Sequence, residues 1–168
     1  MHDGCARRWI CFILRASALR LAYVSRCNLK FTSRLAVSQA ALLLTAVLFG
    51  GSILYSFGFA AFVFTNLPAE TGGPLIRKAF PHFYLFVLAT SAIAATLCAT
   101  SDVVSGVILA TIAVTTLVAR QILMPAVNAA TDQGAARHFK VLHSLSVLIT
   151  LAHIVGAAVV ILRLAALV

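Results

Sequence analysis

Residues 79–119 read AFPHFYLFVLATSAIAATLCATSDVVSGVILATIAVTTLVA, and Asp102 is the only Lys, Arg, Asp or Glu among them. On either side of that carboxylate lies an apolar run close to the roughly 20 residues that a helix needs to cross about 30 Å of hydrocarbon. Because a bilayer offers no water to backbone groups, both runs should be helices. The turn at Asp102 leaves almost no loop, so the two helices should form a hairpin.

Two further charge-free runs flank this hairpin, residues 35–69 before it and residues 141–162 after it. The run 103–119 reaches a membrane-crossing length if its helix continues past Arg120 to Met124. Small residues recur four positions apart in these runs, which lets membrane helices approach closely. We therefore predict an all-α fold, an integral membrane antiparallel four-helix bundle with a basic N-terminal segment and both termini on one side. The expected span boundaries lie near residues 38–64, 80–100, 103–124 and 139–163.

The composition supports a membrane protein and excludes other classes. The chain is 62% hydrophobic and only 10% charged, with a mean hydropathy of +1.04, whereas soluble domains are about 25% charged. The net charge of +9 comes mainly from the first 34 residues, and we expect no nucleic-acid partner because no basic patch is interleaved with aromatic residues. The expected partners are the lipid bilayer and either a second copy or another membrane protein. The expected location is multi-pass in the bacterial inner membrane, with an organelle membrane as the alternative.

Residues 1–34 form a basic leader, and residues 35–168 form the four-span domain. The leader fits an amphipathic helix at the membrane surface, an organelle-targeting sequence, a twin-arginine signal or a poorly structured segment. The predicted orientation depends on the leader. When its basic residues are counted, the positive-inside rule places both termini in the cytoplasm, and when they are not counted the rule predicts the opposite orientation. The leader's basic residues are Arg7, Arg8, Arg15, Arg20, Arg26, Lys30 and Arg34.

Two proline-containing segments, residues 67–84 and 125–143, connect the spans on one predicted membrane face. The first carries three prolines and two glycines, which predict an ordered turn, with Pro81 in the first turn of the next helix. Because the four-span topology puts both segments at the same end of the bundle, we expect them to pack together.

These segments carry two motifs, FVFTNLPAETGGPLIRKAFPHFY at residues 62–84 and MPAVNAATDQGAARHFKVLHSLSVL at residues 124–148. Together they resemble the transmembrane protein 205 family and its bacterial relatives over about residues 40–165. The resemblance implies a small four-helix membrane domain of unsettled biochemical activity, and a link to drug tolerance belongs to the animal members. The motif residues with an implied structural role are Pro68, Thr71, Gly73, Lys78, Phe80, Pro81, Tyr84, Pro125 and Phe139.

Four polar side chains of the last span, His143, Ser146, Thr150 and His153, fall within about 80° of one another on a helix. Such a stripe can line a proton or solute path, because ionisable groups inside a membrane often mark one. It can also be a hydrogen-bond ladder between helices, which is the interpretation that we favour. We expect His143 to face the bundle interior and to bond a group of the first connection or the third span.

Arg120, Asn128 and Asp132 surround Pro125 between the third and fourth spans. Arg120 is expected either to extend toward the membrane surface or to pair with Asp132 across the turn. The alternative is a polar mouth that these residues share with His138 and His143.

The sequence offers no pattern typical of a metal site, a cofactor site or an enzyme. Cys5, Cys11, Cys27 and Cys98 lack the spacing of a metal site and are expected to be free thiols. His143 and His153 are about 15 Å apart along a helix axis, which is too far to share one ion. Three function classes remain open: an accessory or oligomerising membrane component, which we favour, a transporter or permeation component that uses the polar stripe, and a haem-binding or redox membrane protein.

Overall fold

The computed structural model describes residues 32–167, and every regular element within that range is a helix. The chain divides into two compact units, Met1–Ala36 and Val37–Val168. The predictions for the basic leader fall on residues 1–34, of which 1–31 lie outside the described part. The second unit holds the apolar helical domain.

Four helices are long and apolar enough to cross a membrane, namely Thr32–Asn66, Ala69–Cys98, Val103–Asp132 and Ala136–Ala165. The last part of the first helix consists of the π-helix η1 (Leu54–Phe59) followed by α2 (Ala60–Asn66). The second is α3 (Ala69–Cys98). The third joins α4 (Val103–Val118), the π-helix η2 (Ala119–Leu123) and α5 (Met124–Asp132). The fourth is α6 (Ala136–Ala165).

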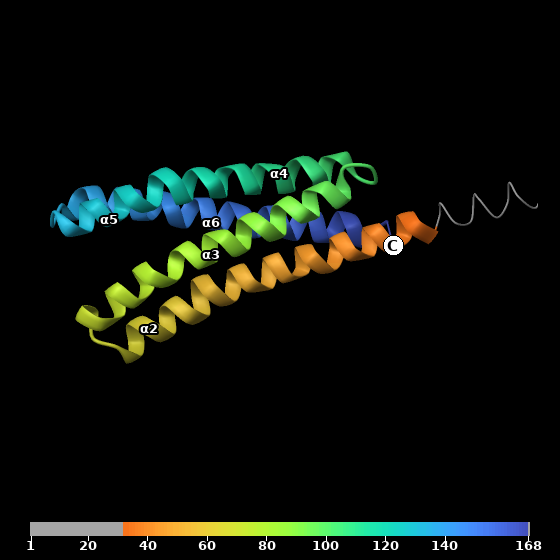
Figure 1. Ribbon diagram of the computed structural model, residues 1–168. Coiled ribbons are helices and arrows are strands. Elements are labelled where there is room, and N and C mark those ends of the chain that lie inside the picture. The colour runs from red at the N-terminus through yellow and green to blue at the C-terminus, as the bar shows by residue number, and fades with distance from the viewer. Residues whose placement is uncertain (1–31, 168) are drawn as a thin grey trace, which may run out of the picture. The chain divides into compact units, whose positions relative to one another are not determined.

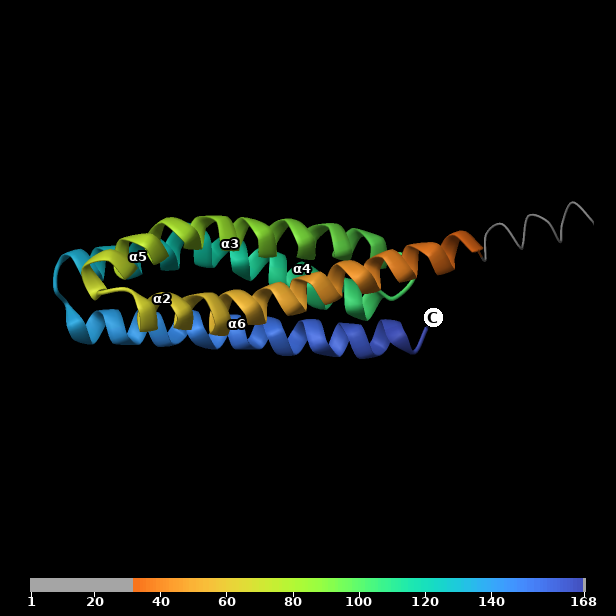
Figure 2. The same ribbon diagram turned by 90° about the horizontal axis from the view of Figure 1, so that it is seen from below.

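Within the second unit the four helices run alternately up and down and are joined by short turns (Figure 1, Figure 2). The hairpin of α3 and α4 is tightly packed, α6 packs on α4 and α5, and α2 packs on α3. The predicted all-α membrane bundle is therefore confirmed, including the hairpin at Asp102.

The main core draws buried side chains from all four helices. It includes Leu48 of the first helix, Val87 of α3, Leu109 of α4 and Val160 of α6. At Gly106 the backbones of α3 and α4 lie close together, since a Cβ built there would be 3.5 Å from the carbonyl oxygen of Ala95, in ordinary van der Waals contact. This is the close approach that small residues permit between membrane helices.

The predicted turn between the first two spans is wrong beyond residue 68. α3 begins at Ala69, not near residue 80, and continues through Pro74 and Pro81. Helical backbone satisfies its own polar groups, and neighbouring helices let membrane helices tolerate proline. Packing also favours the earlier start, because Gly72 is buried and a Cβ there would lie 3.3 Å from Val63 of α2.

The third helix continues past the predicted span boundary near residue 124 and ends at Asp132. Pro125 lies in the first turn of α5, directly after η2. A proline cannot donate to the carbonyl four residues earlier and crowds it. The wider π-turns of η2 immediately before Pro125 accommodate that break without ending the helix.

Candidate functional site

The predicted polar stripe of α6 makes two hydrogen bonds to other helices. The hydroxyl of Ser146 lies 3.2 Å from the hydroxyl of Tyr84 on α3. Tyr84 is buried beside Ala119 and Leu123, so this bond satisfies a phenol in an apolar setting. Because an unpaired buried hydroxyl costs about 1–3 kcal/mol, the pair favours the contact between α3 and α6.

The second bond joins His153 to α4, with 2.7 Å between its Nε2 and the Oγ1 of Thr115. The Thr115 hydroxyl also lies 2.7 Å from the carbonyl oxygen of Thr111. A hydroxyl has one proton to donate. If Thr115 donates to Thr111, it accepts from His153, and the neutral imidazole then carries its proton on Nε2.

Within the described residues, the other two members of the stripe form no hydrogen bond to a neighbouring helix. Thr150 donates to the carbonyl oxygen of Ser146, one turn earlier on α6. His143 is exposed, and its ring stacks on Phe139 with 5.4 Å between centroids. The prediction that His143 faces the interior and bonds another segment is wrong. On a helix His143 lies 60° from Ser146, which carries it off the face that meets α3.

Asp132 pairs with Arg77, so of the two alternatives for Arg120 the pair with Asp132 is wrong. The Nη2 atom of Arg77 lies 2.9 Å from Oδ1 of Asp132 and 3.4 Å from the carbonyl oxygen of Asn128. Arg120 and Asp132 lie on one continuous helix, about 18 Å apart along its axis. No role for Arg77 was predicted, because the residues around it were expected to form a turn.

The Arg77 contacts confirm that the two proline-containing segments pack together. Phe80 and Tyr84 of the first segment also share a hydrophobic cluster with Val127 and Leu142 of the second segment. Met124, which directly precedes the second segment, belongs to the same cluster. An aromatic group extends this contact to the first helix, where Tyr55 stacks on Phe83 with 4.4 Å between ring centroids.

Of the nine motif residues with an expected structural role, four are buried or half-buried and five are exposed. Tyr84 is buried and Phe80, Pro81 and Phe139 are half-buried. The remaining members are exposed: Pro68, Thr71, Gly73, Lys78 and Pro125.

At the opposite end of the bundle, Asp102 and Arg163 form an ion pair that sequence analysis missed. Arg163 Nε lies 3.1 Å from Oδ2 and Nη2 lies 2.9 Å from Oδ1. Ser105 adds a hydroxyl bond of 2.6 Å. The hydrogen bond from Arg163, followed by that from Ser105, lowers the pKa of Asp102 from 3.8 to about 2. The four-span topology already placed Asp102 and Arg163 at one end, which was the available signal.

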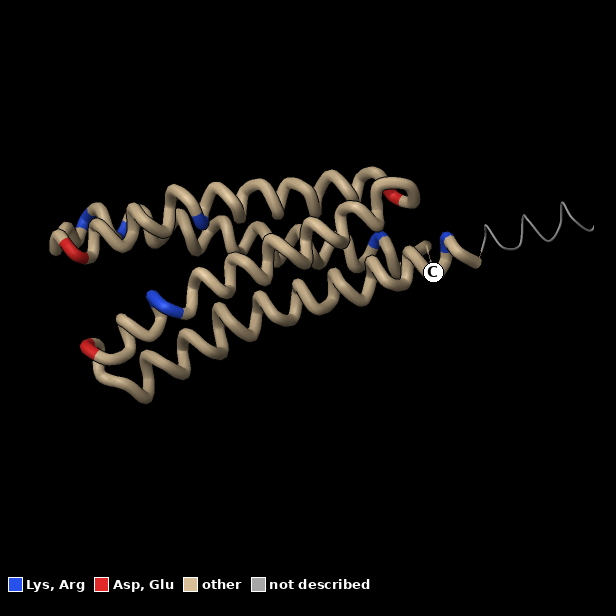
Figure 3. Tube along the Cα trace, viewed as in Figure 1, with Lys and Arg blue, Asp and Glu red and all other residues tan. Residues whose placement is uncertain are grey.

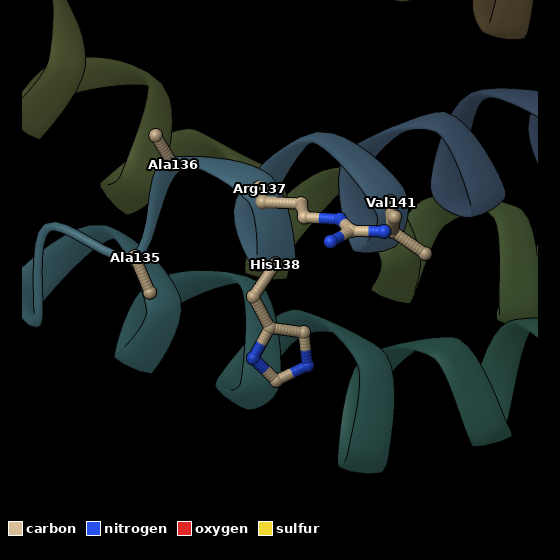
Figure 4. Close-up of a pocket in the computed structure, with 5 residues that line it drawn as sticks. All are labelled: Ala135, Ala136, Arg137, His138 and Val141. Atoms are coloured by element: carbon tan, nitrogen blue, oxygen red, sulfur yellow. The ribbon is translucent and has the colours of Figure 1, made fainter.

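The surface near the start of α6 has a shallow open depression lined by Ala135, Ala136, Arg137, His138 and Val141. Figure 4 shows Arg137 lying along α6 toward Val141, while the imidazole of His138 points away from that guanidinium. The two basic groups therefore do not converge on one enclosed point. Among residues 32–167, no three His, Cys, Asp or Glu side chains lie close enough together to hold a metal ion.

A comparison with protein families identifies the family of this chain. A model described as a domain of unknown function (DUF4149) matches residues 43–136, which is more than half of the 168 residues. The chain belongs to this family. The match covers α2 to α5 and ends at the first residue of α6, so Ser146, His153 and Arg163 lie beyond it. No curated protein and no solved structure was found to match the chain.

Proposed function

We propose that this DUF4149 protein is an accessory component of a membrane that associates with a second copy of itself through the outer face of α6. The observation that carries the proposal is a continuous apolar stripe on that face. Its members are all exposed: Leu145, Leu148, Ala152, Val155, Val159 and Leu162.

The spacing of the stripe is that of a helix–helix seam. Its members follow one another at alternating intervals of three and four residues, which is the a/d repeat of a coiled coil. A helix that meets only lipid needs no such register. α6 is also the least covered of the four helices, with 11% of its most apolar window buried against 33% for Val103–Asp132.

The polar residues of α6 support the same proposal. Ser146 and His153 are bonded to Tyr84 and Thr115, so they hold α6 against the bundle while the apolar stripe stays on the outside. A transport path or a haem site would need these side chains for a solute or an iron ion. Both alternatives therefore receive less support than association.

The resemblance to the transmembrane protein 205 family stays a prediction, since the DUF4149 match does not address it. We include it in the proposal because its bacterial relatives support a location in the bacterial inner membrane. An absorbance spectrum of the purified protein tests the haem alternative, since bound haem gives a strong visible band.

Disulfide cross-linking in membranes tests the association. Leu148→Cys is introduced into a chain in which Cys5, Cys11 and Cys27 are replaced by Ser. In a symmetric dimer built on the seam, Leu148 of one copy lies beside Leu148 of the other, so mild oxidation should give a covalent dimer. The matched control is Val114→Cys on α4, because Val114 is 61% exposed and Leu148 is 63% exposed.

The control should remain monomeric under the same oxidation. Equal cross-linking at both positions would indicate random collision, and no cross-linking at Leu148 would also contradict the proposed seam. Separation of detergent-solubilised wild-type protein by size, with light scattering for its mass, gives an independent count of copies.

A further inference from the structure

The charges of the second unit are distributed unequally between the two ends of the bundle (Figure 3). At one end, Asp102 and Arg163 neutralise each other. Every other charged residue of the second unit lies in a region that we call the charged collar, made of residues 69–78, 120–132 and 136–140. The collar has five basic and two acidic residues, a net charge of +3.

The collar should lie at the level of the lipid headgroups. α3 and α6 each have 30 residues, about 45 Å at 1.5 Å per residue, which exceeds the roughly 30 Å of hydrocarbon. The charge-free parts of the helices begin at Ala79 in α3 and Val141 in α6, and end at Ala119 in the third helix. The excess length therefore projects from one end as the collar.

Four collar cations form no ion pair within the described residues, namely Lys78, Arg120, Arg137 and Lys140, and of these Arg120 is half-buried. Arg77 is paired with Asp132, whereas Lys78, Arg137 and Lys140 are exposed. Cations held at this depth attract the negative surface of an anionic leaflet, at about 1 kcal/mol each.

Arg137 and Val141 together match the two chemical parts of a phospholipid. They lie one turn apart on α6, and the Arg137 side chain extends toward Val141 along the open depression (Figure 4). Val141 is 61% exposed at the start of the charge-free part of α6. An acyl chain can cover this valine while the phosphate above it meets the guanidinium. A soluble anion would make only the second contact.

We propose that the charged collar binds the headgroups of anionic phospholipids, with Arg137 and Lys140 as the principal cations and Val141 in contact with an acyl chain. The collar end then lies in the leaflet that is richer in anionic lipid. This surface adjoins the seam of the proposed dimer, because the exposed Val141 lies four residues before Leu145; measuring the mass of the Arg137/Lys140 variant by light scattering keeps the two proposals distinguishable.

The test uses the full chain in mild detergent and measures its thermal unfolding with added lipid. Phosphatidylglycerol should raise the unfolding temperature more than phosphatidylcholine does, and 1 M salt should remove the difference because it shortens the Debye length to about 3 Å. The combined variant Arg137→Gln and Lys140→Gln should raise the half-saturating phosphatidylglycerol concentration roughly 30-fold, about 5-fold for each cation.

The control is the combined variant Arg7→Gln and Arg8→Gln, which removes the same charge from the leader. It should keep the wild-type response, and loss of the response there would assign the effect to the leader and overturn the proposal. An equal response to both lipids would also overturn it.

Three further measurements separate a lipid from other anions and partners. Val141→Ser should weaken the response to phosphatidylglycerol. Glycerol 3-phosphate, the soluble headgroup fragment, should have no effect at matched concentration, and full stabilisation by it would show a site for free phosphate. Light scattering of the Arg137/Lys140 variant should be unchanged, since loss of a dimer would show that the collar binds a second copy.

Discussion

Arg163 holds Asp102 through two parallel hydrogen bonds, and this pair joins the C-terminal part of α6 to the turn between α3 and α4. The Asp102 side chain is only 8% exposed, whereas in the second ion pair the Asp132 side chain is 63% exposed. Hydrogen bonds to charged groups contribute more when the group is desolvated. The two ion pairs should therefore differ in their contribution to stability.

Replacement of Asp102 by Asn should lower the free energy of unfolding by about 2 kcal/mol, the value typical of bonds to a charged group. Asn keeps a side-chain acceptor for the start of α4 but leaves the guanidinium of Arg163 without a carboxylate. Unfolding in mixed micelles with increasing SDS measures the change. The matched control is Asp132→Asn at the exposed pair, which should cost less than about 1 kcal/mol; equal costs would contradict the difference in burial.

The same pair predicts a loss of stability in acid. Because the pKa of Asp102 in the folded protein is lowered from 3.8 to about 2, its contribution is fully present above about pH 4. That contribution is lost as the pH falls through 2. The unfolding temperature measured from pH 7 to pH 2 should therefore show a decrease below pH 4 that is smaller in Asp102→Asn. An identical decrease in both proteins would exclude Asp102 as its cause.

Sequence patterns predicted the helices well because the length of each apolar run is set by the bilayer. They failed at Pro74, Pro81 and Pro125, where local turn preferences were overridden by packing between helices. They also failed at His143, since a difference of 60° around the helix decides whether a side chain meets α3. Such rotations depend on tertiary contacts that helix periodicity does not specify.

Close packing at Gly106 gives a third prediction. Replacement of Gly106 by Leu should cost about 1–3 kcal/mol, the range for overpacking a well-packed site, because the backbone of α3 lies beside it at Ala95 and Ala99. The control is Gly50→Leu on the first helix, since a Cβ there meets nothing within 4 Å. SDS titration of both variants tests this, and a neutral Gly106→Leu would mean that α3 and α4 can separate freely.

The hydrogen bond between Thr115 and His153 is the sharpest test of how the polar stripe is used. Bonds of this kind between membrane helices average about 0.6 kcal/mol, so Thr115→Val and His153→Phe should each be mildly destabilising. Their double-mutant cycle should return a coupling free energy of that size. Thr111→Val is the control, because Thr111 is exposed and bonds only within its own helix at Val107. It should show no coupling to His153→Phe. If the coupling between Thr115→Val and His153→Phe were also zero, the bond to Thr115 would not hold α6 against α4. That result would favour the alternative in which α6 lines a path for protons or solutes.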